Sequence, residues 1–305
     1  MAFLYTPATN QRINAKLIMT EEEHISALKI LIGEQKKLLS ISLEVAFGNQ
    51  LKFNNTIVKC KVSQNKIKTG IMNAMDGGTS VNTILKISDW RGIPVRDLFP
   101  IARASLEAFI NASYLIAEDE WASKRAIKYV EYAHFKQTNR KAGSGEFSFT
   151  LSSDTEGIRI DVGNVNEVNT RNERFSEFNG SGNGNWSKLD VASRIRRVGE
   201  LVGKDAGGCL LAAYTMIYSI SSEIIHGSPY GHAYFFGLCK SKGTGHDYEK
   251  FSEDTASHVH TILLALSWGV SGYLSVFFKK YNLTELEEAN REVFLQIMRA
   301  QGIKV

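Results

Sequence analysis

Charged side chains occur inside helices that the sequence otherwise makes apolar. Arg103 and Glu107 are four residues apart, and Arg125 and Tyr129 repeat this spacing on the next predicted helix. Residues four apart share one face of a helix, so each pair can act together. A single buried charge is costly, whereas a paired one is tolerated. We therefore interpret Arg103 and Glu107 first as an ion pair that orients two helices.

A polar stripe follows on a later predicted helix, where side chains step by four residues: Tyr214, Tyr218, Ser222 and His226. Two interpretations stay open. In the first, the stripe is a hydrogen-bonded set between packed helices. In the second it is a site, in which His226 is a general acid or base oriented by Tyr218 and Ser222. An arginine would then stabilise an anion beside it.

Other chemistries have little support in the sequence. His258 and His260 are two residues apart and diverge on a helix, which argues against a metal pair. The cysteines form no CxxC or zinc-like cluster. Motifs of the P-loop, of dinucleotide-binding folds, of nucleophile elbows and of zinc proteases are missing. We therefore expect no cofactor and no metal.

Helices must position these residues, because apolar side chains recur at helical spacing along most of the chain. The predicted helices cover about 20–48, 67–87, 95–117, 119–139, 195–201, 205–226, 252–281 and 284–301. We expect Thr20 to cap the first helix, Gly77-Gly78 to interrupt or strain the second, and Gly227 to end the sixth. Thr284 and Glu287 have the spacing of a capping box. Five lysines within 52–68 suggest either a phosphate-binding patch or, by base rates, a solvated helix face.

The composition changes between residues 143 and 185, where Gly, Ser, Asn and Thr dominate. Residues 147–151 and 158–162 alternate with period two around a turn, which predicts a β-hairpin. A loop without regular structure is expected to follow, as a variable, flexible insertion. The fold class is therefore all-α: one multi-helix domain over residues 1–305, with a small β-hairpin and flexible loop insertion at 143–185.

Composition bounds the class of protein. The 305 residues are 43% hydrophobic and 22% charged, which suits a globular domain with a sizeable core. The net charge of +4 neither demands nor forbids a nucleic-acid partner. Three cysteines and no evident signal peptide indicate a cytoplasmic protein. The uncharged stretch 261–278 is long enough to span a bilayer, but its serines and glycines suit a core helix, so no membrane partner is expected.

The order of several short motifs resembles a bacterial family, domain-of-unknown-function family 5677. The similarity covers about residues 20–235 and rests on the following segments: 103–108 with its R-x-x-x-E pattern, Arg125 with 129–132, Trp186-Ser187, 198–201 and 218–229. The resemblance implies an all-α domain and no particular reaction.

The segment from Ser221 to Gly227 is also similar to the end of the HEPN signature, R-[NH]-x-x-x-H-G. HEPN proteins are helical bundles, and many are dimeric RNA-cleaving toxins or defence nucleases. In that signature an arginine and a histidine flank the scissile phosphate. His226 matches the histidine, but Ser221 stands in place of the arginine, so the chemistry would need Arg103 or Arg125 as the cation.

Two classes of function remain open. The first is a non-catalytic helical protein that acts through interactions, as a homodimer or with a protein partner, in a bacterial stress or phage-defence operon. The second is a HEPN-like, metal-independent ribonuclease or toxin that uses His226 as acid and base, with RNA as its partner. The candidate site residues for it are His226, Arg103, Glu107, Tyr218, Ser222 and Arg125.

Overall fold

The computed structural model describes residues 20–154, 157–163, 172–179, 185–238 and 248–303. The chain divides into two compact units, and each is described by itself. The first unit comprises residues 1–118 and 191–305, and the second comprises residues 119–190. Helices dominate the described residues, so the predicted all-α class with a small sheet is confirmed.

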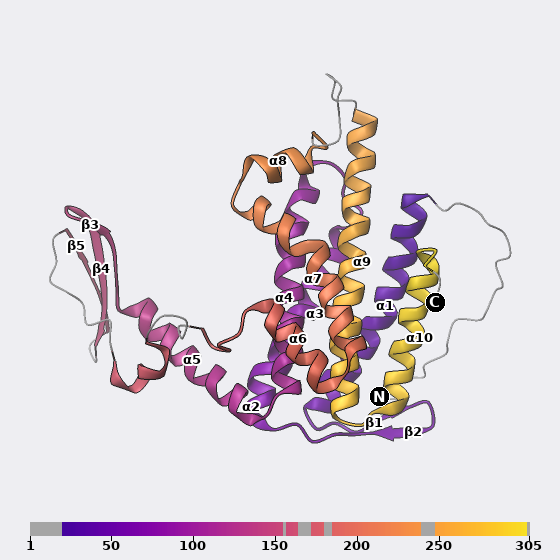
Figure 1. Cartoon of the computed structure of the whole chain (residues 1–305), viewed down its shortest axis with the longest axis horizontal. Coiled ribbons are helices and arrows are strands. Elements are labelled where there is room, and N and C mark those ends of the chain that lie inside the picture. Colours follow the sequence, from indigo (N-terminus) through magenta and orange to yellow (C-terminus); the bar gives the residue numbers. More distant parts are fainter. Residues whose placement is uncertain (1–19, 155–156, 164–171, 180–184, 239–247, 304–305) are drawn as a thin grey trace. The chain divides into compact units, whose positions relative to one another are not determined.

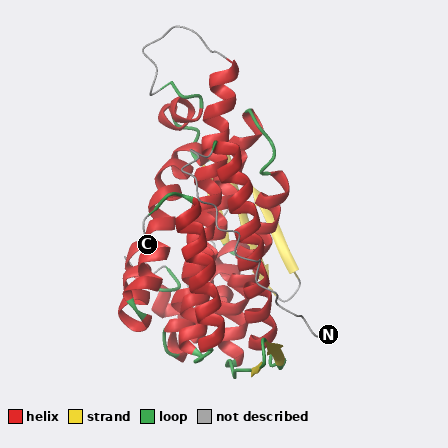
Figure 2. Ribbon diagram, turned by 90° about the vertical axis from the view of Figure 1, so that its right-hand side faces the viewer, coloured by secondary structure: helices red, strands yellow, loops and turns green. Residues whose placement is uncertain are grey.

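The first unit is built around one long helix, α9 (Tyr248–Lys280). Four helices pack against it: α1 (Glu21–Ala46), α4 (Leu98–Ala117), α7 (Lys204–Ile225) and α10 (Thr284–Ala300). Outside this layer, α3 (Met72–Ile87) packs on α4, and α6 (Val191–Val202) packs on both α4 and α7. Figure 1 shows α9 between α7 and α1, and Figure 2 shows the helices running side by side.

Short elements join these helices. A hairpin of β1 (Leu51–Phe53) and β2 (Thr56–Val58) follows α1, and a turn of α-helix, α2 (Gln64–Lys66), comes after it. The 3₁₀ helix η2 (Ile93–Asp97) leads into α4, and α8 (Pro229–Phe235) follows α7. The hairpin and α8 were not predicted, because each is too short to show a clear apolar period.

The structure differs from the expectation that Gly77-Gly78 interrupt the second predicted helix, α3. Gly77 and Gly78 lie inside a continuous helix, not at a break. A Cβ at Gly77 would lie 3.1 Å from the Phe109 ring, and one at Gly78 would lie 2.8 Å from Leu39. These glycines therefore let helices approach closely. The irregular backbone comes earlier, in the π-helical segment η1 (Ile67–Ile71).

Helix ends were predicted with mixed success. Thr20 forms a capping box with Glu23 at the start of α1, and Gly227 follows α7 with a φ of +62°. The predicted capping box of α10 is wrong, because Leu283 is the N-cap and makes no side-chain hydrogen bond. Thr284 is already inside the helix, since the chain turns one residue earlier through Asn282 in the left-handed region.

The lysines between β1 and η1 have two different environments. Lys66 is buried, and its Nζ donates to the carbonyl oxygens of Ile116 and Glu118 at 2.8 and 2.7 Å. Lys280 donates to the Ala117 carbonyl at 2.8 Å. Both ammonium groups thus satisfy the C-terminal carbonyls of α4, where cations are favoured. The other lysines of this stretch are exposed.

Among the described residues, two helices are long and apolar enough to cross a membrane by length and composition, within α7 and α9. Most of the apolar window of α9 is buried by its four neighbouring helices, as in the core helix of a soluble protein. Phe277 is fully buried there and Trp268 is partly buried. Core packing therefore accounts for the uncharged stretch. The prediction of no membrane partner stays a prediction.

The second unit combines a helix and a sheet. It contains α5 (Glu120–Thr138), β3 (Arg140–Ser144), β4 (Phe147–Asp154), β5 (Gly157–Val162) and the 3₁₀ helix η3 (Glu173–Phe178). The strands form an antiparallel sheet in the order β3-β4-β5, so the predicted hairpin is confirmed and gains a third strand. The aromatic rings of Tyr132, Phe175 and Phe178 join α5 to η3. The predicted flexible loop lies largely outside the described residues.

Candidate functional site

Arg103 and Glu107 are half-buried on the side of α4 that meets α7, and they pair as predicted. The Arg103 Nε donates to Glu107 Oε1 at 2.8 Å. The side chains are 19% and 34% exposed, so the pair is only partly buried. The Arg103 guanidinium also lies over the Tyr218 ring, 4.2 Å from its centroid. This cation–π contact joins α4 to α7.

Tyr214 and Tyr218 continue this contact along α7. Their rings stack with centroids 4.4 Å apart. Burial and the neighbouring Tyr218 raise the pKa of the Tyr214 phenol. A small hollow with room for about one water molecule lies here, lined by Arg103, Leu106, Glu107, Tyr214, Ile217 and Tyr218. Ligand pockets usually occupy roughly 300–1,000 Å³, so this hollow is too small for a typical small molecule.

The end of α7 carries the histidine of the candidate site. His226 is exposed and is the C-cap of α7, with its backbone N–H bonded to the Ser222 carbonyl. Within the described part of the chain, the His226 side chain has no hydrogen-bond or ionic partner. Ser221 is fully buried, and its hydroxyl donates to the Phe99 carbonyl at 3.1 Å. The position of the missing HEPN arginine therefore faces the core.

A different arginine, Arg96 of η2, reaches this helix end. Its Nη2 lies 3.5 Å from the carbonyl oxygen of Ile224, two residues before His226. Both Arg96 and His226 are exposed. Arg96 was not predicted, because it comes more than a hundred residues before His226 and lies outside any motif. Its position just before an apolar helix was the only available signal.

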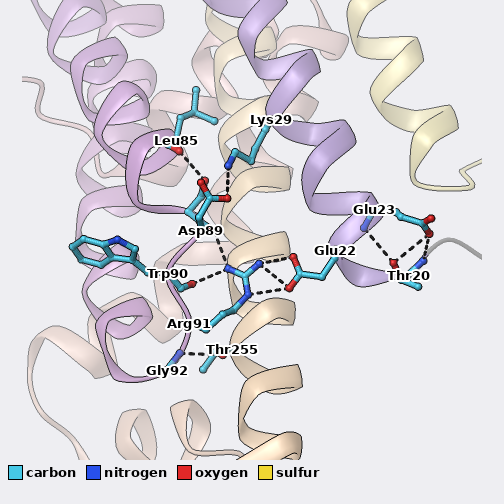
Figure 3. Close-up of polar contacts among 11 residues, drawn as sticks. Thr20, Glu22, Glu23, Lys29, Leu85, Asp89, Trp90, Arg91, Gly92 and Thr255 are labelled. Atoms are coloured by element: carbon cyan, nitrogen blue, oxygen red, sulfur yellow. Dashed lines mark hydrogen bonds and ion pairs between the residues drawn. The ribbon is translucent and has the colours of Figure 1, made fainter.

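The turn that leads to η2 is held by charged contacts, drawn in Figure 3. Arg91 makes a bidentate pair with Glu22 of α1, with the closest N–O distance 2.6 Å. Lys29 pairs with Asp89 at 2.6 Å, and the Gly92 N–H donates to the hydroxyl of Thr255 on α9. These contacts join the turn to two helices and thereby position the segment that carries Arg96.

Arg125 belongs to the second unit and has a structural environment there. Its Nη1 pairs with Glu177 of η3 at 2.7 Å, and its guanidinium lies 4.5 Å from the centroid of the Phe178 ring. The hydrogen bond from Lys128 lowers the pKa of the Glu177 carboxyl, and Arg125 adds to this effect. Arg125 therefore joins α5 to η3.

The two later histidines diverge, as expected. His258 is buried with Nε2 3.3 Å from the Phe235 carbonyl oxygen, whereas His260 contacts Glu21 and Gln301. Among the described residues there is no group of three or more His, Cys, Asp and Glu side chains suited to a metal. The prediction of no cofactor and no metal stays a prediction.

One face of the second unit's sheet is apolar and exposed, a feature that the sequence analysis overlooked. We call it the sheet face and define it by Phe147, Phe149, Ile158, Ile160 and Val162. Phe147 is 92% exposed and Val162 is 79% exposed. The opposite face carries the buried Ser148 and Thr150. The alternation in both strands was visible, but an apolar face is normally assigned to the core, and here it is outside.

The structure thus brings together only part of the predicted site. Arg103, Glu107, Tyr214 and Tyr218 form one cluster between α4 and α7. Ser222 and His226 lie further along α7, and Arg125 lies in the other unit. The described residues form an all-α bundle and a small sheet-bearing unit, with this polar cluster between α4 and α7.

Comparison with known families places the chain in one of them. A family model, the family of unknown function DUF5677, matches residues 90–261, which is more than half of the chain. The chain belongs to this family. The match begins later than the resemblance seen in the sequence and includes every candidate site residue. A search of curated proteins and a search of solved structures found no match.

Proposed function

We propose that this chain is a non-catalytic helical protein that acts through protein–protein contacts made by the sheet face. The observation that carries the proposal is the exposure of that face. Five large apolar side chains share it, and four of them are more than 60% exposed. Patches of this kind usually mark interaction sites.

The pairing of the candidate cations also supports this proposal. Arg103 pairs with Glu107 and stacks on Tyr218, and Arg125 pairs with Glu177. The neighbouring carboxylates of Glu107 and Glu177 offset the positive charge of these two guanidinium groups, which weakens their attraction for a phosphate. A catalytic histidine needs its partners arranged around the reacting group before reaction. The cluster between α4 and α7 is better explained as a contact that joins two helices.

Site-specific photo-crosslinking in growing cells tests the interaction function. A photoreactive phenylalanine analogue at Phe147 should give covalent adducts with protein. The matched control is the same analogue at Leu211, which is exposed and apolar but lies on α7, outside the sheet face. Adducts at Phe147 and none at Leu211 are expected. Equal adducts at both positions, or none at Phe147, would contradict the proposal.

A second function, a HEPN-like metal-independent ribonuclease, is favoured by one specific observation. Arg96 and His226 are both exposed at the same end of α7. In this alternative, Arg96 supplies the phosphate-binding cation that Ser221 cannot, and His226 exchanges the proton. The candidate partner would then be RNA.

Incubation with single-stranded RNA in the presence of EDTA separates the two functions. The interaction function predicts no cleavage above background by wild-type protein. Cleavage that is lost in both His226→Ala and Arg96→Ala, but kept in the exposed control Arg299→Ala, would establish the nuclease instead. The proposed bacterial stress or phage-defence setting is tested by the neighbouring genes, among which a nucleotidyltransferase or another defence gene would favour the nuclease.

A further inference from the structure

The outer edge of β5 has hydrogen-bonding groups that point away from its sheet. In the β4–β5 pair, the Gly163 N–H donates to the Ser148 carbonyl at 2.8 Å, and this bond sets the alternation along the strand. Residues 157, 159, 161 and 163 therefore face β4. The backbone groups of Ile158, Ile160 and Val162 face outward. Among the described residues no strand pairs with this side of β5, the last strand in the order β3-β4-β5, so these groups form an open edge there.

The strand β5 carries one positive and one negative side chain, two residues apart. Arg159 and Asp161 flank Ile160 on the side opposite the sheet face. Neither makes an ion pair within the part of the chain that the structure describes. Like charges directly opposite one another on adjacent strands are destabilising, and unlike charges are stabilising. The pattern therefore discriminates between possible neighbouring strands.

We propose that the outer edge of β5 pairs with the β5 of a second copy of this chain, antiparallel about Ile160. This inference rests on the interaction function and names one partner of the sheet. In this register Ile160 lies opposite Ile160 of the second copy, and Ile158 lies opposite its Val162. Both are hydrogen-bonded pairs, because these residues carry the outward-facing groups. The two three-stranded sheets become one of six strands.

The same register places Arg159 opposite Asp161 of the second copy, and Asp161 opposite its Arg159. These are non-hydrogen-bonded pairs, in which the side chains lie closest. A shift of two residues in either direction would put Arg159 opposite Arg159 or Asp161 opposite Asp161. A parallel arrangement lacks the two-fold symmetry that a closed dimer needs. Charge complementarity therefore selects one arrangement.

The first test is oligomeric state with charge exchange. Sedimentation equilibrium of the full chain should give twice the 34.0 kDa of the monomer. Arg159→Asp should weaken the dimer about tenfold, because it places two pairs of carboxylates opposite each other. The double exchange Arg159→Asp with Asp161→Arg recreates both pairs and should restore wild-type association. Matching circular dichroism and melting temperature will show that each variant folds.

The second test fixes the register by disulfide formation. Opposed residues in a hydrogen-bonded pair have Cα atoms about 5.5 Å apart, within the range of a disulfide. Ile160→Cys should therefore oxidise to a covalent dimer. Ile158→Cys alone should not, because its two copies would lie about 13 Å apart along the strand. A mixture of Ile158→Cys and Val162→Cys should crosslink, with the wild-type chain as the control for its own cysteines.

The outcomes distinguish this inference from the function on which it rests. A monomer at tens of micromolar, or a dimer whose affinity is unchanged by Arg159→Asp, would overturn the β5 pairing. Failure of the double exchange to restore association would also overturn the β5 pairing, because Arg159 would then not lie opposite Asp161 of the second copy. If Phe147 still crosslinks to another protein in those cases, the interaction function stands. His226-dependent RNA cleavage would show that the protein is not non-catalytic, whatever the oligomeric state.

Discussion

Arg103 shows how a helix-face charge pair can serve packing at the residue scale. Its guanidinium contacts Glu107 on its own helix and Tyr218 on the next one. Because the pair is partly exposed, water can replace either partner. The cost of losing one charge should then follow the rule for surface pairs, not the rule for buried ones.

Glu107→Ala should therefore lower the free energy of unfolding by only about 1 kcal/mol. A fully buried pair would lose roughly 3–5 kcal/mol. Urea denaturation measures the difference, and Glu34→Ala, which removes an exposed pair with Lys37, is the control. A loss above 3 kcal/mol would mean that Arg103 is left without solvent access in the folded protein.

Two thiols should react slowly in the folded protein. Burial raises the pKa of Cys60 and of Cys209 from 9.0 to about 11. Only the thiolate is nucleophilic, so alkylation by iodoacetamide at pH 8 should be about a hundredfold slower than in the unfolded chain. Mass spectrometry of each peptide, with and without urea, gives the ratio. Equal rates in both states would show that these thiols are not shielded.

The same shifts make stability depend on alkaline pH. A thiol whose pKa is raised by folding is neutral in both states below pH 9, so its contribution is complete there. Between about pH 9 and 11 the unfolded chain ionises first, and stability falls as the pH rises. Urea midpoints from pH 8 to 11 should therefore decline, and Cys209→Ala should reduce the decline. A urea midpoint that does not change with pH would contradict the effect of these thiols on stability.

Close approach between helices is the main constraint at the element scale. Gly199 of α6 and Gly207 of α7 face each other where these helices pack. A Cβ at Gly207 would lie 2.8 Å from the Gly199 Cα. Backbone atoms cannot rotate away, so the helices would have to separate. Neighbouring Gly208 has no atom within 4 Å of a Cβ and is exposed.

These two glycines should respond in opposite directions to alanine. Gly207→Ala should destabilise the protein by about 1–3 kcal/mol through overpacking. Gly208→Ala should stabilise it by roughly 0.5–1 kcal/mol, since alanine is the better helix former. Thermal unfolding of both variants makes the comparison. Two changes of the same sign would show that helix propensity, not the contact between α6 and α7, dominates here.

At the scale of the whole molecule, the first unit closes on itself without the second. Its chain leaves at Glu118 and returns at Val191, and Arg197 of α6 pairs with Glu118 at 2.6 Å. The helices α4 and α6 therefore already pack where the chain departs. The unit also has its own core around α9.

Replacement of residues 119–190 by a short Gly/Ser linker should leave a folded helical protein. We expect one cooperative thermal transition and a helical circular dichroism spectrum. The shortened chain lacks β5 and should therefore be monomeric. Loss of cooperative unfolding would show that the first unit depends on residues 119–190, as the predicted single domain implies.

The long helices could be predicted from local patterns, because an apolar period and a helix cap act between residues that are close along the chain. The helix start at Thr20 and the helix end at Gly227 were predicted from such local patterns, and so were the strands β4 and β5. The pairing of Arg103 with Glu107 followed from their spacing of four. Tertiary structure decided the rest, since it depends on distant residues. It placed Arg103 on Tyr218, Arg96 at the end of α7, Lys66 at the end of α4 and the apolar sheet face outside. No local pattern specifies which helices meet or which face of a sheet is covered.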